Sequence, residues 1–417
     1  MNAPGLSRRT FIGRAGAAGA GAALAGAGLA ACGDDGPART ARSASTTIAA
    51  QTVPFRGAHQ AGIVTPVQDR LVFASFDVVT DDPDQLADLL DRWTEAAESL
   101  TGGRLMPGGM SAPDVPPADT GEAYGLPPAD LTITIGYGPT LFDRRFGLAG
   151  KKPAALAPLP RFPLDNIQPA ISGGDLCLQA CANDPLIAYN AIHNLTRAGI
   201  GVVSVRMMQI GFGRTSSTST SQATARNLMG FKDGTRNLKV EEPELVDSWV
   251  WSKGSGDQRW MQGGSYLVAR KIRMLVETWD VETLSGQEAV FGRAKDTGAP
   301  LGEDSEFATP DLDEHHDGRP VIPDDAHIRL ASPAHNGGVH LLRRGYNYSD
   351  GVDPTQGNFA SGLFFIAFTS DPDHFTKVQR TLAHGDALNE YIKHTASGLY
   401  ACPAGARPGG FVGETLL

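Results

Sequence analysis

The chain has 417 residues, of which 41% are hydrophobic and 20% are charged, and its formal net charge is −10 at pH 7. That length is enough for one large or two medium domains with sizeable cores. The acidic balance offers no basic footprint for nucleic acid and argues against that class of partner.

The first 32 residues are typical of an export signal. Two adjacent arginines in Ser7–Ile12 precede an Ala/Gly-rich, moderately apolar stretch from Ala15 to Ala31. This pattern predicts a twin-arginine signal, which a receptor of the export machinery recognises. The signal is not expected to be part of the folded domain. We therefore expect export by the twin-arginine route to a periplasmic, other extracytoplasmic or secreted location.

The predicted signal ends in Leu29–Cys32, a tetrapeptide similar to a lipobox. If Cys32 is lipidated, acyl chains tether the mature protein to the outer face of the membrane. Cleavage by an ordinary signal peptidase would instead leave a soluble protein. We favour the lipoprotein, because Cys32 lies where the apolar run stops and a polar linker begins.

Residues 33–49 form that linker, which is rich in Gly, Asp, Ala, Ser and Thr and has no hydrophobic period. Such a composition predicts a disordered spacer. After the linker, no stretch of the sequence is long and apolar enough to predict a membrane span.

The first half of the remaining chain repeats a strand followed by a helix. A predicted strand at 71–79 leads to Asp81–Pro83, which opens a helix over 84–100. A capping residue just ahead of Pro suits a first helical turn, because Pro lacks the N–H that would be unpaired there. Two more strand–helix units follow. The first has a strand at 130–137 with a helical stretch after it, and the second has a strand at 175–181 with a helix at 185–198.

The second half repeats the scheme. A strand is predicted at 266–274 with a helix after Thr278, and a strand at 362–369 precedes a helix that Ser370–Pro372 opens and that ends near residue 383. Units of this kind in both halves predict an α+β protein with two ferredoxin-like domains related by duplication. We place them at 50–215 and 222–417, joined by the Ser/Thr-rich stretch 211–222.

Cysteine is sparse for an exported protein. Cys177 and Cys181 have a CxxxC spacing, which differs from the CxxC of a zinc or redox pair, and no second ligand pair follows them. Together with Cys402 they are best explained as buried thiols that fill a core. A disulfide between them stays open.

Three phrases hold the residues with the most chemistry. They are Gly230–Asn237 (GFKDGTRN), Asp324–Ala331 (DDAHIRLA) and Leu341–Tyr346 (LLRRGY). A GxxDG loop followed by an isolated His and then an Arg resembles the dye-decolourising peroxidase family, most closely its secreted deferrochelatase/peroxidase branch. The resemblance covers nearly the whole mature chain. It implies a dimeric α+β barrel of two ferredoxin-like domains and one haem b per chain.

The resemblance assigns the axial ligand of the haem iron to His327. Neutral imidazole binds haem iron well, and the apolar Ile328 and Leu330 flank this His. His315 and His316, in an acidic loop bounded by Pro and Gly, are more often solvated than metal-bound. His59 is interpreted as structural or as lining an access route.

A ligating His usually donates its second ring N–H to an acceptor. The family places a carboxylate near the C-terminus for this purpose, and Asp386 matches that region. The alternative is that Asp386 only caps the helix that follows.

Asp233 is the predicted acid/base catalyst, because a carboxylate within hydrogen-bond reach can move a proton between the two oxygens of peroxide. As an alternative, Asp233–Gly234 is a plain turn.

Arg343 is the predicted distal cation, since a guanidinium stays charged and can stabilise developing negative charge. The family phrase favours Arg343 over Arg344. The residues expected near the haem edge, propionates or proximal side are Gly234, Thr235, Arg236, Ser332, Pro333 and Ala334.

The implied function is a haem peroxidase that reduces hydrogen peroxide and oxidises dyes or other one-electron donors. The alternative is an extracytoplasmic haem-binding protein or deferrochelatase of iron uptake, with iron-uptake partners. A homo-oligomer is expected. Large donors would need electron transfer through an aromatic residue near the surface, and the candidates are Trp249, Trp251, Trp260, Tyr346 and Tyr348.

Overall fold

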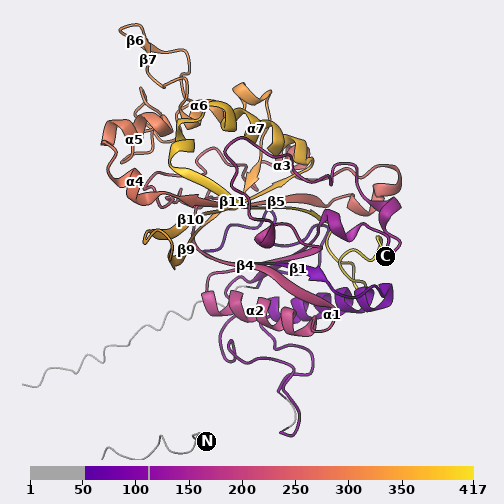
Figure 1. The fold of residues 1–417 in the computed structure, drawn as a ribbon. Helices are drawn as coiled ribbons and strands as arrows, with labels where there is room; N and C mark the ends of the chain where they lie inside the picture. Colours follow the sequence, from indigo (N-terminus) through magenta and orange to yellow (C-terminus); the bar gives the residue numbers. More distant parts are fainter. Residues whose placement is uncertain (1–51, 111–112) are drawn as a thin grey trace, which may run out of the picture. The chain divides into compact units, whose positions relative to one another are not determined.

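A computed structural model describes residues 52–110 and 113–417, which form helices packed on a curled antiparallel sheet (Figure 1). The predicted signal and linker lie outside the described residues. Nine strands belong to the main sheet, in the order β5-β11-β2-β3-β1-β4-β9-β10-β8.

The first group of strands has the order β2-β3-β1-β4, and each neighbouring pair is antiparallel. Its members are β1 (Arg70–Val78), β2 (Thr132–Tyr137), β3 (Leu176–Ala182) and β4 (Val203–Arg214). The second group repeats this arrangement as β9-β10-β5-β11. Its members are β5 (Ser265–Met274), β9 (Tyr346–Val352), β10 (Phe359–Thr369) and β11 (Ile392–Cys402). The same strand order twice is the ferredoxin-like pattern of a duplicated chain.

The two groups join edge to edge, through Ala401 of β11 opposite Tyr137 of β2 and through Phe212 of β4 opposite Asn347 of β9. Since β5 pairs with both β11 and β10, the sheet closes on itself. The predicted α+β barrel of two ferredoxin-like units is therefore confirmed, while the domain boundaries stay predictions. Because β4 continues to Arg214, the predicted joining stretch begins as strand.

The three long helices begin where the sequence predicts. Asp82, Asp184 and Asp371 each accept hydrogen bonds from backbone N–H groups of the first turn, and Pro follows each of them. These helices are α1 (Pro83–Thr101), α2 (Pro185–Ala198) and α7 (Pro372–Gly385). In Figure 1, α1 and α2 lie below the first group of strands and α7 lies above the second.

Shorter elements complete the described fold. They are α3 (Pro243–Trp249), α4 (Val276–Asp280), α5 (Leu284–Phe291), α6 (His327–Leu330), β6 (His315–His316), β7 (Arg319–Pro320) and β8 (Leu342–Arg343). The helix predicted after Tyr137 is wrong, because that stretch forms only the 3₁₀ turns Pro139–Leu141 and Ala149–Lys151. Pro153 and the further prolines that follow deny a longer helix its backbone donors.

Strands β1, β2 and β3 are buried on both faces. On β1, Val72, Ala74 and Phe76 pack toward α1 and α2, whereas Leu71 and Phe73 point into the barrel. Alternate side chains of a strand point to opposite faces, so one strand serves two cores. This explains why the strands contain almost continuous apolar runs.

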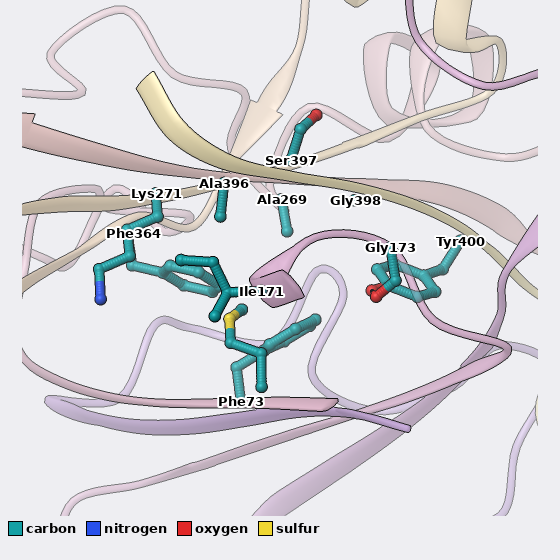
Figure 2. Close-up of a pocket in the computed structure, with 11 residues that line it drawn as sticks. Phe73, Ile171, Gly173, Ala269, Lys271, Phe364, Ala396, Ser397, Gly398 and Tyr400 are labelled. Carbon is teal, nitrogen blue, oxygen red and sulfur yellow. Dashed lines mark hydrogen bonds between the residues drawn. The ribbon is translucent and has the colours of Figure 1, made fainter. Parts of the chain in front are cut away.

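The interior of the barrel is filled by side chains. Figure 2 shows Phe73, Phe364 and Tyr400 facing one another between the two strand groups, with Ile171 beside them. The ring of Phe73 lies 5.1 Å from that of Phe364 and 6.0 Å from that of Tyr400. The cavity among them is about 10 Å³, room for about one water molecule. Between these rings the barrel is therefore a packed core.

Cys177, Cys181 and Cys402 are buried, and the structure contains them as free thiols. Cys177 and Cys402 flank Gly136 on neighbouring strands. Burial raises the pKa of all three thiols, which keeps them protonated and unreactive. The prediction of buried core thiols is confirmed.

Within the residues that the structure describes, no helix has the length and apolarity needed to cross a membrane.

A buried ion pair between Arg270 of β5 and Asp165 gives a test of this fold. The two side chains are only 1% and 4% exposed, and Arg270 also lies over the ring of Phe162. Removing one partner leaves a buried charge unpaired, so Asp165→Ala should lower the free energy of unfolding by about 3–5 kcal/mol. The measurement is denaturant unfolding followed by circular dichroism.

The double variant Asp165→Ala/Arg270→Met serves as the control. It removes both charges, so it should recover a large part of the stability that the single variant loses. A single variant as stable as the wild type would show that the pair is not buried as described.

Candidate active site

The loop between β4 and α3 holds Asp233 in a fixed turn. Gly230 and Gly234 have φ values of +85° and +79°, and residues other than glycine rarely adopt such values. A Cβ at Gly234 would lie 2.9 Å from the Cα of Ser216. The N–H of Asp233 donates to the carbonyl of Ala225 at 2.9 Å. The two glycines of the GxxDG spacing therefore have a steric reason, and the turn holds Asp233 between them.

Asp233 faces Arg343 of β8 across 110 residues of sequence. Nη1 of Arg343 donates to Oδ1 of Asp233 at 3.1 Å, and Nδ2 of Asn227 approaches Oδ2 at 3.4 Å. The side chains of Asp233 and Arg343 are 18% and 29% exposed. The pair is thus shielded from bulk water but remains open to a small molecule.

Asn237 was not among the predicted site residues, yet it fixes the backbone of Arg343 from both sides. Its Oδ1 accepts the N–H of Arg343 at 2.8 Å, and its Nδ2 donates to the carbonyl of Arg343 at 2.9 Å. The only sequence signal was its place at the end of the GFKDGTRN phrase. Arg344 is turned the other way and donates to Gln68 Oε1 at 2.8 Å inside the protein. The structure therefore places Arg343, and not Arg344, beside Asp233.

His327 is the first residue of α6, and Asp386 lies at the end of α7. Nδ1 of His327 is 2.6 Å from Oδ2 of Asp386, so Nε2 is the nitrogen left to bind a metal. The other oxygen of Asp386 accepts the N–H of Leu388 at 2.9 Å. One carboxylate thus orients the imidazole and caps the following turn, so the two interpretations of Asp386 hold together.

His327, Asp233 and Arg343 share one electrostatic environment. Burial lowers the pKa of His327, but the Asp386 carboxylate more than offsets this, and the net pKa is raised. The charge of Asp233 also raises the pKa of His327, and that of Arg343 lowers it. The rings of Phe231, two residues before Asp233, and Phe291 stack with their centres 4.2 Å apart, and the ring of Phe291 lies 6.2 Å from that of His327. One phenylalanine therefore lies next to both the Asp233 loop and the predicted iron ligand.

Three features of the structure fit a haem. Nε2 of His327 is available as a ligand, and the ring of Phe291 lies 6.2 Å from the imidazole. Phe291 belongs to an apolar cluster of Met229, Phe231, Met274, Trp279, Phe291, Leu388 and Tyr391. Burial, and then the positive charge of Arg236, lowers the pKa of Arg293 to about 10, with Arg343 adding to this effect and Glu306 and Asp233 opposing it. Propionates placed here would be attracted by the three guanidinium groups.

The remaining predicted haem contacts are less direct. Thr235 donates to Glu306 Oε1 at 3.2 Å, and Arg236 donates to the carbonyl of Ala308 at 3.0 Å. The hydroxyl of Ser332 donates to the carbonyl of Arg329 at 2.7 Å. Pro333 and Ala334 follow and begin a 3₁₀ turn. Their roles at a haem stay predictions.

The other candidate histidines have structural settings. His315 and His316 lie exposed in the β6–β7 hairpin that projects in Figure 1. Among the described residues, no group of three or more His, Cys, Asp or Glu is placed to hold a metal ion. His59 stacks on Trp251 with ring centres 3.7 Å apart and contacts the carbonyl of Gly263 at 2.6 Å.

Burial separates the five aromatic candidates for electron transfer. Trp251, Trp260, Tyr346 and Tyr348 are at most 6% exposed. Trp249 is partly exposed, and its ring lies 4.9 Å from His374 and 5.7 Å from His340. Trp249 is therefore the one of the five that a bulky donor could approach.

A polar cavity of about 290 Å³ lies elsewhere, between the β1 and β4 ends. It is lined by Val53, Thr65, Pro66, Val67, Gln68, Asp69, Asp130, Asn183, Arg214 and Gln222. None of the predicted site residues lines it.

Comparison with known proteins agrees with this geometry. Residues 60–213 match the family model "Dyp-type peroxidase, N-terminal" and residues 224–407 match "Dyp-type peroxidase, C-terminal". A deferrochelatase of Yersinia pseudotuberculosis is 39% identical over 377 residues, covering 88% of this chain and 85% of that protein. A deferrochelatase of Escherichia coli is 38% identical over 371 residues, covering 87% of each chain.

A solved structure shows the same fold. The DyP-type peroxidase of Streptomyces coelicolor superposes with a TM-score of 0.82 at 38% identity, covering 89% of this chain and 99% of that one. Both family models and these relatives span most of the described residues. The chain therefore belongs to the DyP-type peroxidase family of haem-dependent enzymes.

Proposed function

We propose that Asp233 moves the proton and Arg343 stabilises the negative charge in this haem peroxidase, and that His327 would bind the haem iron. The observation that supports this most is the 3.1 Å contact between Asp233 and Arg343. A second is His327, whose Nδ1 is already engaged by Asp386. The proposed acid/base group, cation and iron ligand come from three distant parts of the sequence. The overall reaction is the reduction of hydrogen peroxide to two water molecules with two protons and with two electrons, one from each of two one-electron donors.

Haem b, when bound, supplies the redox centre that takes oxidising equivalents from peroxide and passes them to donors. Asp233 can accept a proton from one peroxide oxygen and return it to the other, because its carboxylate is open to a small molecule. Arg343 stays charged and stabilises negative charge as the O–O bond lengthens. The Asn237 clamp keeps that guanidinium in place.

We assign the groups that would hold the haem as follows. His327 binds the iron, and Asp386 fixes its ring and raises its basicity. Arg236, Arg293 and Arg343 supply positive charge for the propionates. The backbone of Gly234 and Thr235 approaches the haem edge, and residues 332–334 line the proximal side.

A second function, release of iron from haem, is favoured by the relatives named deferrochelatase. Both functions use the same His327 and the same haem contacts. They differ in the product, which is oxidised donor in one case and iron-free porphyrin in the other.

We further propose export through the predicted twin-arginine signal, residues 1–32, and a lipid anchor at Cys32. The support is the sequence pattern around Arg8 and Arg9. A homo-oligomer and contacts with iron-uptake proteins are part of this proposal. A mass spectrum of the mature protein shows whether Cys32 is the acylated amino terminus.

The variant Asp233→Asn tests the acid/base role. An amide keeps the size of the side chain but cannot carry the proton, so the rate constant for reaction with hydrogen peroxide should fall by roughly 10²–10⁴-fold. Stopped-flow absorption of the haem-loaded protein measures this rate constant. Haem content should match that of the wild type.

Asp350→Asn is the matched control, because Asp350 pairs with Lys271 at an exposed site. It should react at the wild-type rate. If Asp233→Asn also does, the proton is carried by another group and the assignment fails.

Asp386→Asn tests the support of the axial ligand. An amide presents one acceptor where the carboxylate presents two, so it cannot serve both His327 and Leu388. We expect haem affinity to fall by about 10–100-fold, measured by titrating the haem-free protein with haem. Asp184→Asn changes a capping carboxylate on α2 to an amide that can still accept the same two N–H groups, so it should leave haem affinity as it was.

Porphyrin fluorescence separates the two functions. When haem-loaded wild-type protein is incubated with a reductant and an iron chelator, a peroxidase alone keeps its haem intact. Accumulation of iron-free porphyrin that His327→Ala abolishes would establish iron release.

A further inference from the structure

A short segment that follows α5, residues 306–309, lies against the loop that holds Asp233. Glu306 forms an ion pair with Lys232 through Oε2 and accepts the hydroxyl of Thr235 through Oε1 at 3.2 Å. Arg236 donates to the carbonyl of Ala308 and to the hydroxyl of Thr309, both at 3.0 Å. This segment thus binds the side chains on both sides of Asp233–Gly234.

The contacts of Glu306 bracket the catalytic turn. One carboxylate uses one oxygen for the residue before Asp233 and the other for the second residue after it. Asp233 itself is left free to contact Arg343. The turn contains two glycines, whose backbone is free to adopt many conformations. The bonds from Glu306 add to the backbone bond between Asp233 and Ala225 in holding it in one of them.

Glu306 is itself firmly placed. Its side chain is 11% exposed, and its backbone carbonyl accepts Nη1 of Arg293 at 3.2 Å. Arg293 also donates to the carbonyl of Gly298 at 2.6 Å. Burial raises the pKa of Glu306, but the bonds from Lys232 and other donors outweigh this and lower it overall. The group that brackets the turn is therefore a buried, ionised carboxylate with a donor on each oxygen.

We propose that Glu306 is a positioning residue for the peroxidase reaction, which holds the 230–237 loop so that the Asp233 carboxylate stays against Arg343. The inference rests on the proposed role of Asp233. It adds a residue from a remote segment that touches neither Asp233 nor the predicted iron ligand.

The expected loss of rate follows from how far the Asp233 carboxylate can move. A displacement of about 1 Å at a catalytic group can cost on the order of 10²-fold in rate. Removing the charge of Glu306 releases Lys232 and loosens the turn without removing Asp233 or Arg343. The expected consequence is a slower reaction with peroxide and an unchanged affinity for haem.

The test compares haem-loaded wild type with Glu306→Gln and Thr235→Val. Thr235→Val removes only the bond to Oε1 and keeps the shape of the side chain, so it is informative even if the first variant folds poorly. Asp304→Asn, an exposed carboxylate two residues from Glu306, is the matched control. Three quantities are measured: the rate constant with peroxide, the dissociation constant for haem, and hydrogen–deuterium exchange of a peptide covering residues 228–238.

For Glu306→Gln we expect the peroxide rate constant to fall by about 10–100-fold, with the haem dissociation constant within twofold of wild type. Exchange should rise in the 228–238 peptide and stay the same elsewhere. Thr235→Val should show a smaller change of the same kind, and Asp304→Asn none.

Unchanged exchange in the 228–238 peptide would overturn the proposal, as would a rise across the whole chain with a lower melting temperature, which indicates a purely structural role. These outcomes differ from failure of the proposed function. If Asp233→Asn is slow while Glu306→Gln behaves as wild type, only the positioning role of Glu306 is wrong. If Asp233→Asn reacts normally, the role of Asp233 falls and this inference falls with it.

Discussion

The site depends on one contact, the ion pair between Asp233 and Arg343. Asp233 lies in a loop and Arg343 in a two-residue strand, and neither element is long enough to hold a side chain by itself. A partly buried guanidinium needs an anionic partner, and a catalytic carboxylate needs a fixed direction. The Asp233–Arg343 pair meets both requirements, and the surrounding hydrogen bonds hold the two side chains against each other.

Those bonds come from side chains as much as from the sheet. Asn237 binds the N–H and the carbonyl of Arg343 in the manner of a neighbouring strand. β8 is joined to β10 through only two residue pairs. An amide side chain thus supplies the second partner that such a short strand would lack. The catalytic loop and the strand of its partner are in this way one hydrogen-bonded unit.

The duplicated barrel separates stability from chemistry. Its interior is packed with aromatic and aliphatic side chains around a cavity of about 10 Å³, so it provides rigidity and no binding space. Every predicted haem-site residue lies after β4, on loops, on the short elements α6 and β8, or at the end of α7. Loops carried by a rigid sheet can present catalytic groups without weakening the core.

The sequence alone determined the features that are local in the chain. Asp-Pro openings marked three helices, apolar runs marked the five strands β1, β2, β3, β5 and β10, and the GxxDG phrase marked a turn with glycines at positive φ. The chain-order pattern of strand and helix was enough for the fold class. The longer strands β4, β9 and β11 and the two-residue strands β6, β7 and β8 were not predicted, because their pairing follows from neighbours elsewhere in the chain. Only the tertiary structure decided that Arg343 and not Arg344 meets Asp233, that Asp386 both orients His327 and caps a turn, and that Asn237 and Glu306 support the site. Apart from the cap at Asp386, those contacts join residues 59 to 110 positions apart, and no local propensity encodes a contact over such a separation.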